Sequence, residues 1–262
     1  MVGVNPREGF VMSRMNGLVA IVTGASRGLG RAVAKEYARE GALVVICARS
    51  QSPTGLSGSI DETAQAIKSA GGEVFPVDCD VTDEKQVEEM VRRVVERYGR
   101  IDVLFNNAGA MVLGESILEI DPKRWDQVML VNVTGPYLCS RAVLPTMIGQ
   151  RRGSIINIGS RMATDPMQGG GVLYSSSKAA VQMFSLCLAE EVREHNIAVN
   201  ILSPGSLKSE GSAAIPWTQR DWHERVDPGE VGPCAVYLAL QDATTFTGRL
   251  AARVEFGQTW GF

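Results

Sequence analysis

Short apolar runs alternate with amphipathic stretches along almost the whole of this 262-residue chain. The runs have the length of buried strands, and apolar residues recur between them at helical spacing. The predicted strands are 19–23, 43–48, 73–77, 103–106, 154–158, 198–202 and a short last one near 251–255, and the clearest predicted helices are 29–40, 84–98, 125–146 and 173–195. Strands that alternate with helices in this way predict an α/β fold, a doubly wound parallel sheet of about seven strands with helices on both faces.

The chain shows no internal repeat and no linker, so we expect one domain over 17–262. The first 16 residues fit a disordered tail, or partly a misassigned start, because Met12 and Met15 lie just before the first strand. The loop 50–59 is long and rich in Gly, Ser and Pro. The polar stretch 206–227 follows the sixth strand, where a doubly wound sheet opens its ligand crevice, and it is a candidate substrate lid rather than a plain solvated loop.

Composition excludes several classes of partner and site. Net charge is −3, no basic run occurs and no apolar stretch approaches 18 residues, so neither nucleic acid nor a membrane is an expected partner. The five cysteines are scattered without a CxxC pair and there are only two histidines. We therefore expect no metal site and no disulfides, but buried thiols in a reducing cytoplasm.

A glycine-rich segment follows the first predicted strand. Gly24, Gly28 and Gly30 have the spacing Gly-x3-Gly-x-Gly rather than GxGxxG. Glycines at a strand-to-helix turn allow positive φ and a close approach of phosphate, and the helix N-terminus offers free N–H groups to a pyrophosphate. Taken alone, a glycine-rich segment is as often a plain turn between two elements as a phosphate-binding turn.

The end of the second strand indicates which dinucleotide is bound. An acidic residue there binds the ribose 2′-hydroxyl of NAD, whereas a basic residue accommodates the 2′-phosphate of NADP. The chain reads Cys47-Ala48-Arg49 with no acid, and Arg27 in the glycine turn can add a second positive charge. The sequence favours NADP(H), although NAD(H) is possible if Arg49 is only a solvated strand-end residue.

Tyr174 and Lys178 lie four residues apart within a predicted helix, so they share one face. Reduction of a ketone needs a proton donor at the carbonyl oxygen. We expect the Lys178 ammonium to lower the pKa of Tyr174 from about 10. Ser160 would donate a hydrogen bond to the substrate oxygen. Outside this framework, a Tyr–Lys pair at this spacing is common on helix surfaces.

These motifs occur in a fixed order, together with Asp80-Val81, Asn106-Asn107-Ala108-Gly109, Asn132 and Pro204-Gly205. In this order they resemble the short-chain dehydrogenase/reductase superfamily, from about residue 17 to the end. The resemblance implies a Rossmann-type fold, a nicotinamide cofactor and a homotetramer built on the two long helices. The order matters more than any single motif, because each motif alone also has an ordinary structural explanation.

The resemblance also assigns roles by position. Asp80 and Val81 would contact the adenine, Asn106, Ala108 and Gly109 would line the cofactor cleft, and Asn132 would help to hold a proton-relay water. The implied cofactor-binding residues are Gly24, Ser26, Arg27, Gly28, Leu29, Gly30, Arg49, Asp80, Val81, Asn106, Ala108, Gly109, Tyr174, Lys178, Pro204 and Gly205, and the implied catalytic residues are Asn132, Ser160, Tyr174 and Lys178.

Several positions depart from the family pattern. Ser160 and Tyr174 lie 14 positions apart where the family usually shows 13. Arg161 follows the serine directly, and Ser209 stands where a threonine usually contacts the carboxamide. The long loop 50–59 and the residues 59–63 resemble the branch that contains hydroxysteroid dehydrogenase-like proteins. These departures affect the substrate more than the fold.

We therefore expect an NADP(H)-dependent oxidoreductase that interconverts a secondary alcohol and a ketone. Its substrate would have substantial apolar area, against candidate lining residues Met111, Met162, Met167, Leu173, Trp217 and Trp222. Three alternatives remain: an NAD-linked alcohol dehydrogenase, lyase or epimerase chemistry on the same scaffold, and a non-catalytic dinucleotide-binding protein. The last has no evident need for all four catalytic candidates.

Overall fold

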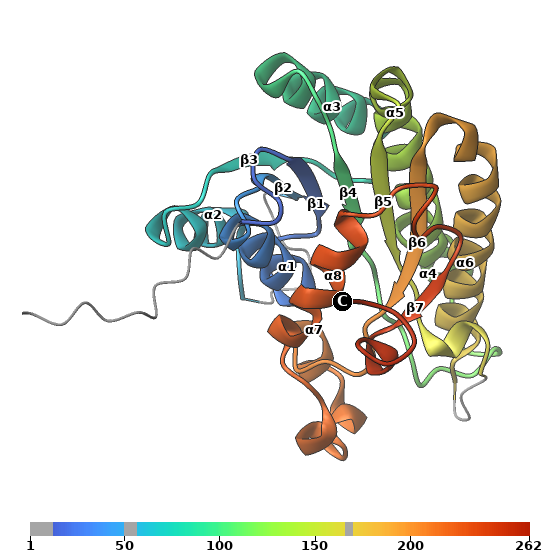
Figure 1. Cartoon of the computed structure of the whole chain (residues 1–262). Coiled ribbons are helices and arrows are strands. Elements are labelled where there is room, and N and C mark those ends of the chain that lie inside the picture. The colour runs from blue at the N-terminus through green and yellow to red at the C-terminus, as the bar shows by residue number, and fades with distance from the viewer. Residues whose placement is uncertain (1–12, 50–56, 166–169) are drawn as a thin grey trace, which may run out of the picture.

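Seven parallel strands form one sheet in the computed structural model, which describes residues 13–49, 57–165 and 170–262. The strands are β1 (Val19–Thr23), β2 (Leu43–Ala48), β3 (Val74–Asp78), β4 (Val103–Asn106), β5 (Gly153–Ile158), β6 (Ile197–Ser203) and β7 (Leu250–Ala252). Their order across the sheet is β3-β2-β1-β4-β5-β6-β7 (Figure 1). This arrangement confirms the predicted α/β class and the doubly wound topology.

Helices cover both faces of the sheet, which explains why the strands are apolar throughout. Helices α1 (Gly28–Arg39), α2 (Ile60–Ser69) and α8 (Gly232–Ala239) pack on one face, and α3 (Glu84–Tyr98), α5 (Gly135–Gln150) and α6 (Val172–Glu191) on the other (Figure 1). Within β1, Ala20 and Val22 belong to the first core and Val19 and Ile21 to the second. Each strand thus contributes side chains alternately to two apolar layers.

Some predicted boundaries are wrong. The chain after β7 turns into a 3-10 turn at Arg253–Glu255, so the last strand is shorter than 251–255. The helix predicted over 125–146 spans α4 (Pro122–Met129), a π-helical turn at Leu130–Thr134, and α5. Helices α2 and α8 were not among the predicted elements.

The packed chain also begins earlier than residue 17. Met15 is fully buried, and the Arg14 guanidinium binds both oxygens of Glu40 at 2.7 and 3.0 Å. Residues 13–16 are therefore part of the domain, while the rest of the expected tail lies outside the described residues. Most of the loop 50–59 lies outside them as well.

The segment 206–227, called the lid segment below, contains α7 (Glu210–Ala213) and two 3-10 turns at Pro216–Gln219 and Trp222–Glu224. Its two ends are joined, because Lys208 N–H donates to the Val226 carbonyl and Val226 N–H donates to Ser206. The lid segment is thus a long loop whose two ends are hydrogen bonded to each other. Within the described residues, no helix has the length and apolarity needed to cross a membrane.

Candidate active site

The strand order reverses between β1 and β4, and the carboxyl ends of these two strands form the crevice where open α/β sheets bind ligands. The Thr23 hydroxyl accepts hydrogen bonds from the N–H groups of Asn107 and Ala108, at 2.9 and 3.0 Å. The Asn107 amide donates to the carbonyls of Thr23 and Gly24, at 2.9 and 3.1 Å. Asn107 therefore braces the glycine turn, a role that we did not assign to it from the sequence.

The glycine turn needs its glycines. Gly24 has φ +63°, and a Cβ there would lie 2.8 Å from Ala108 Cα. A Cβ on Gly30 would lie only 2.4 Å from the Gly24 carbonyl oxygen. Gly28, with φ +53°, donates its N–H to a carboxylate oxygen of Glu210 at 3.0 Å. The turn thus binds an anion at the first turn of α1, which fits the pyrophosphate of a dinucleotide.

The residues expected around the adenosine differ in their exposure and in their hydrogen-bond partners. Arg27 donates to the Gly58 carbonyl at 3.3 Å, and Arg49 is exposed at the end of β2. The Asp80 carboxylate accepts from the Thr82 N–H and hydroxyl at 3.0 and 2.7 Å, so it caps its own loop. Val81 is buried beside Gly135.

Tyr174 and Lys178 lie in the first two turns of α6, beyond the end of β5. The Lys178 ammonium donates to the Ile158 carbonyl at 2.7 Å and lies 5.7 Å from the centre of the Tyr174 ring. The Ser160 side chain lies close enough to Tyr174 to lower the pKa of the phenol, and the Gln182 amide donates to the Ser160 carbonyl at 3.0 Å. The structure therefore brings three predicted catalytic side chains together, despite the additional residue between Ser160 and Tyr174.

The expected direction of the Tyr174 pKa is wrong for this structure. Burial raises the pKa of Tyr174 to about 12, and the hydrogen bond with Ser160 only partly opposes that rise. Burial also lowers the pKa of Lys178 to about 8. The ammonium faces the ring and a backbone carbonyl instead of acting on the phenol oxygen, and loss of solvation outweighs it.

Asn132 lies at the centre of the π-helical turn between α4 and α5. Its amide donates to the Ala110 carbonyl and to Ser177, both at 2.9 Å, and its oxygen accepts from Ala110 N–H at 2.7 Å. Pro136 lacks the N–H that would bond the Asn132 carbonyl in an α-helix, which accounts for a break at this point. The Gly135 N–H instead reaches Leu130, a π-type bond.

Asn106 does not line the crevice as expected. Its side chain is buried in the sheet and donates to Asn157 at 2.8 Å, so the second asparagine of the pair, and not the first, faces the glycine turn. Alternation of side chains along β4 explains the difference. Ala108 and Gly109 follow at the crevice, where a Cβ on Gly109 would lie 3.3 Å from the Asn132 oxygen.

The remaining predicted cofactor-binding residues differ in burial. Ser26 is half-buried and its carbonyl accepts from Arg31 at 2.6 Å, whereas Leu29 is buried in the core. Pro204 is buried, its carbonyl bound by Arg253 at 3.0 Å, and Gly205 has φ +80°.

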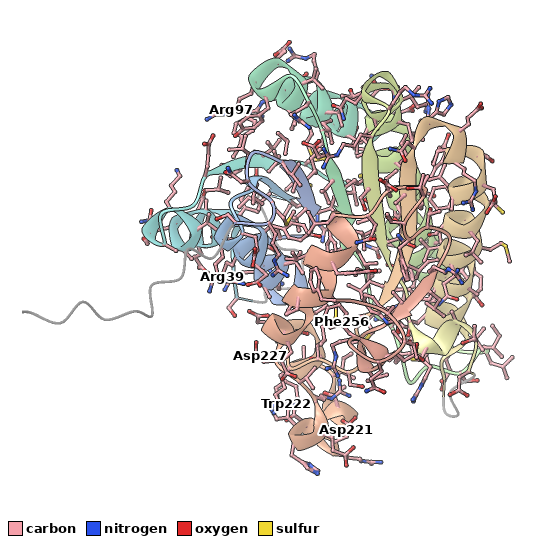
Figure 2. All side chains as sticks on the ribbon, viewed as in Figure 1. Arg39, Arg97, Asp221, Trp222, Asp227 and Phe256 are labelled. Carbon is pink, nitrogen blue, oxygen red and sulfur yellow. The ribbon has the colours of Figure 1, made fainter. Side chains whose placement is uncertain are left out.

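Of the candidate substrate-lining residues, Leu173 is buried and offers almost no surface, while Met111 is exposed. Trp222 lies on the lid segment (Figure 2), and it lines a cavity together with Gly28 and Arg31 of α1. Met167 lies outside the described residues, as does the side chain of Trp217.

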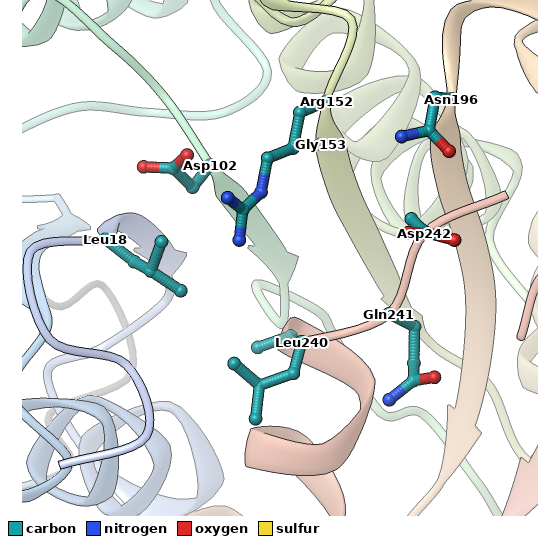
Figure 3. A pocket seen from close by; sticks show the side chains of 9 residues that line it. Leu18, Asp102, Arg152, Gly153, Asn196, Leu240, Gln241 and Asp242 are labelled. Carbon is teal, nitrogen blue, oxygen red and sulfur yellow. The ribbon is translucent and has the colours of Figure 1, made fainter. Parts of the chain in front are cut away.

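A second cavity, of about 260 Å³, lies at the opposite edge of the sheet. It is bounded by residues that precede β1, β4 and β6, and Arg152 extends into it (Figure 3). Ligand crevices of open α/β sheets lie at the carboxyl ends of the strands, so this cavity is separate from the candidate site.

Comparison with known proteins agrees with this geometry. The family model "short chain dehydrogenase" matches residues 18–219. The 3-oxoacyl-(acyl-carrier-protein) reductase FabG of Thermotoga maritima is 32% identical over 246 residues, which is 90% of this chain and 96% of that protein. Hydroxysteroid dehydrogenase-like protein 2 of Rattus norvegicus is 39% identical over 193 residues, 73% of this chain and 36% of that longer protein.

A solved structure extends the likeness to a bound cofactor. A metagenomic short-chain oxidoreductase in complex with NADP has a TM-score of 0.75 and 33% identity, over 91% of this chain and 98% of that one. The residues that the family model matches, 18–219, contain both the glycine turn and the Tyr174–Lys178 pair. The chain therefore belongs to the short-chain dehydrogenase/reductase family of NAD(P)-dependent oxidoreductases.

Proposed function

We propose that the protein is an NADP(H)-dependent oxidoreductase that interconverts a secondary alcohol and a ketone. The observation that carries this proposal is that Tyr174, Lys178 and Ser160 lie together at the same edge of the sheet as the glycine turn, whose Gly28 N–H binds the Glu210 carboxylate. A protein that only binds a dinucleotide has no use for a half-buried phenol and a buried ammonium, both of which lose solvation there.

A bound nicotinamide dinucleotide supplies or accepts the hydride. In the direction of reduction, Tyr174 keeps its proton at neutral pH, because its pKa is raised to about 12, and donates it to the carbonyl oxygen. Ser160 donates a hydrogen bond to the same oxygen and orients it. Lys178 provides a positive charge close to the ring as the phenol loses its proton. Asn132 fixes Ala110 and, through Ser177, the Tyr174 carbonyl.

Three observations support NADP(H) over NAD(H). The second strand ends without an acid, Arg49 is exposed there, and Arg27 lies in the neighbouring turn. A guanidinium pairs strongly with a phosphate group. The solved relative that carries NADP adds weight to the same choice.

For the substrate, we propose a chemical class and no single compound. Met111 is exposed and Met162 half-buried near Ser160, which favours a substrate with apolar area. The homotetramer stays a prediction, supported by the exposed apolar side chains Tyr137, Met183 and Leu186 on α5 and α6. The cytoplasmic location also stays a prediction.

Fluorescence-monitored titration with NADPH and NADH tests the cofactor assignment. We expect wild-type protein to bind NADPH more tightly, and Arg49→Ala to weaken NADPH by about tenfold while leaving NADH unchanged. Arg152→Ala, an exposed arginine at the opposite edge of the sheet, is the matched control and should change neither affinity. Equal or NADH-favoured binding would assign an NAD-linked dehydrogenase instead. Binding of neither dinucleotide would reject the enzyme proposal.

A further inference from the structure

The lid segment places a carboxylate in the position where the cofactor pyrophosphate is expected. Glu210 is the first residue of α7, and its Oε2 accepts the Gly28 N–H at 3.0 Å. Its other oxygen lies 4.0 Å from the Arg31 guanidinium, and the side chain is 32% exposed. Glu210 thus binds the first turn of α1 as an anionic ligand would.

Given the proposed function, we infer that Glu210 is an internal competitor of the dinucleotide: its carboxylate occupies the Gly28 anion site and must leave before a pyrophosphate can bind. A carboxylate and a pyrophosphate cannot share one N–H group, and their like charges repel each other. The lid segment also packs closely against α1 at this point. A Cβ on Gly28 would lie only 3.3 Å from Ser209 Cβ.

The carboxylate is held firmly enough to compete and loosely enough to be displaced. A hydrogen bond to a charged acceptor contributes more than a neutral one, but solvent screens the Arg31 pair at 4.0 Å. Arg31 cannot follow Glu210 outward, since it is also bound to the Ser26 carbonyl at 2.6 Å and to Thr63 at 3.1 Å. A displaced Glu210 therefore exchanges both partners for water.

Displacement of Glu210 involves the start of α7 as a unit. Ser209 and Ser212 form a reciprocal capping box, with bonds of 2.9 and 3.2 Å, so the first turn of α7 is locally stable. Gly205, with φ +80°, precedes the lid segment and allows the chain to pivot. Cofactor binding is in this way coupled to the position of the lid segment and of the cavity of about 410 Å³ between it and α1.

The test measures dissociation constants for three ligands: NADPH, 2′-phospho-ADP-ribose, and adenosine 2′-monophosphate, which lacks the pyrophosphate. Glu210→Gln keeps the shape and removes the charge, and Glu210→Ala removes the group. Glu224→Gln is the matched control, since it removes the same charge from an exposed lid residue that pairs with its neighbour His223.

We expect both Glu210 variants to bind NADPH and 2′-phospho-ADP-ribose about tenfold more tightly than wild type, with adenosine 2′-monophosphate unchanged. The control should match wild type for all three ligands.

Three results would overturn this inference. Unchanged or weaker NADPH binding by the Glu210 variants, with wild type binding normally, would reject the competitor and leave the proposed function intact. If no variant binds any dinucleotide, both the competitor and the proposed function fail. An equal gain in Glu224→Gln would also reject it, because lid charge alone would then explain the effect.

Discussion

The floor and the rim of the candidate site are built differently. The floor consists of Thr23, Asn107, Asn132 and Lys178, whose polar atoms are bound to backbone or to one another. The rim consists of Arg49, which is exposed, and the lid segment, which touches α1 through the contact between Glu210 and Gly28. A floor of this kind is preorganised for one chemistry, while an exposed rim can change its ligand preference without disturbing the core.

This comparison predicts that changes on the floor have larger effects than changes on the rim. The tenfold effect expected for Arg49→Ala or Glu210→Ala is the reference for the rim. Changes at the floor, or at residues in contact with it, should alter activity or affinity by more than about tenfold, or alter stability or pH dependence instead.

The largest effect is expected for Tyr174→Phe. The substitution removes the proton donor and keeps the ring, so turnover of a ketone found in a substrate screen should fall by about 10²–10⁴-fold. Dinucleotide affinity should change by less than about twofold, because the ring that lies under Lys178 is retained. Steady-state kinetics and the titration described above measure the two quantities. Residual turnover within tenfold of wild type would show that another group supplies the proton.

A smaller effect, on stability and cofactor binding together, is expected for Gly30→Ala. The new Cβ would lie 2.4 Å from the Gly24 carbonyl oxygen and 2.5 Å from the Asn107 amide, so the turn must deform. We expect a loss of about 1–3 kcal/mol in the free energy of unfolding and weaker NADPH binding. Gly149→Ala is the control: nothing lies within 4 Å of its Cβ in α5, and it should stabilise the protein slightly. Equal behaviour of the two variants would mean that the turn is not preorganised.

The smallest effect is a pH dependence set by Lys178. Its pKa is about 8 in the folded protein, below its ordinary value of 10.5, so the ammonium loses its proton as pH rises through about 8. Reductive kcat/KM should therefore fall above pH 8, although Tyr174 stays protonated to about 12.

Stability should respond in the opposite direction. Between about pH 8 and 10.5 the unfolded chain holds the Lys178 proton that the folded protein has lost, so this residue makes the free energy of unfolding rise with pH. Denaturant unfolding at several pH values measures the rise, and Lys178→Met should abolish it. Activity that stays constant to pH 10 would show that Lys178 is not needed as a cation.

Much of the fold was predictable from local pattern. The apolar runs of β1, β2 and β4 and the stripe that contains Val33 and Tyr37 on α1 are buried as predicted, because continuous or periodic apolar residues must be covered wherever they occur. Helix α2 was not predicted, since its signal is short and follows a loop rich in Gly and Ser.

The site was predictable in its residue types but not in its contacts. The order of motifs identified the glycine turn and the Tyr174–Lys178 pair. It could not tell that Asn106 is turned into the sheet while Asn107 holds the turn, because that depends on the register of β4 beside β1 and β5. The π-helical turn at Asn132 likewise follows from Pro136 only once the two helices are known to be continuous.

The α/β architecture, the glycine turn and the family of the chain follow from the sequence, since they depend on periodicity and on the order of motifs along the chain. The pKa shifts of Tyr174 and Lys178 and the contact of Glu210 with Gly28 arise only in the folded molecule. Desolvation and contacts between residues 182 positions apart, such as Gly28 and Glu210, are properties of the packed molecule and leave no local pattern in the chain.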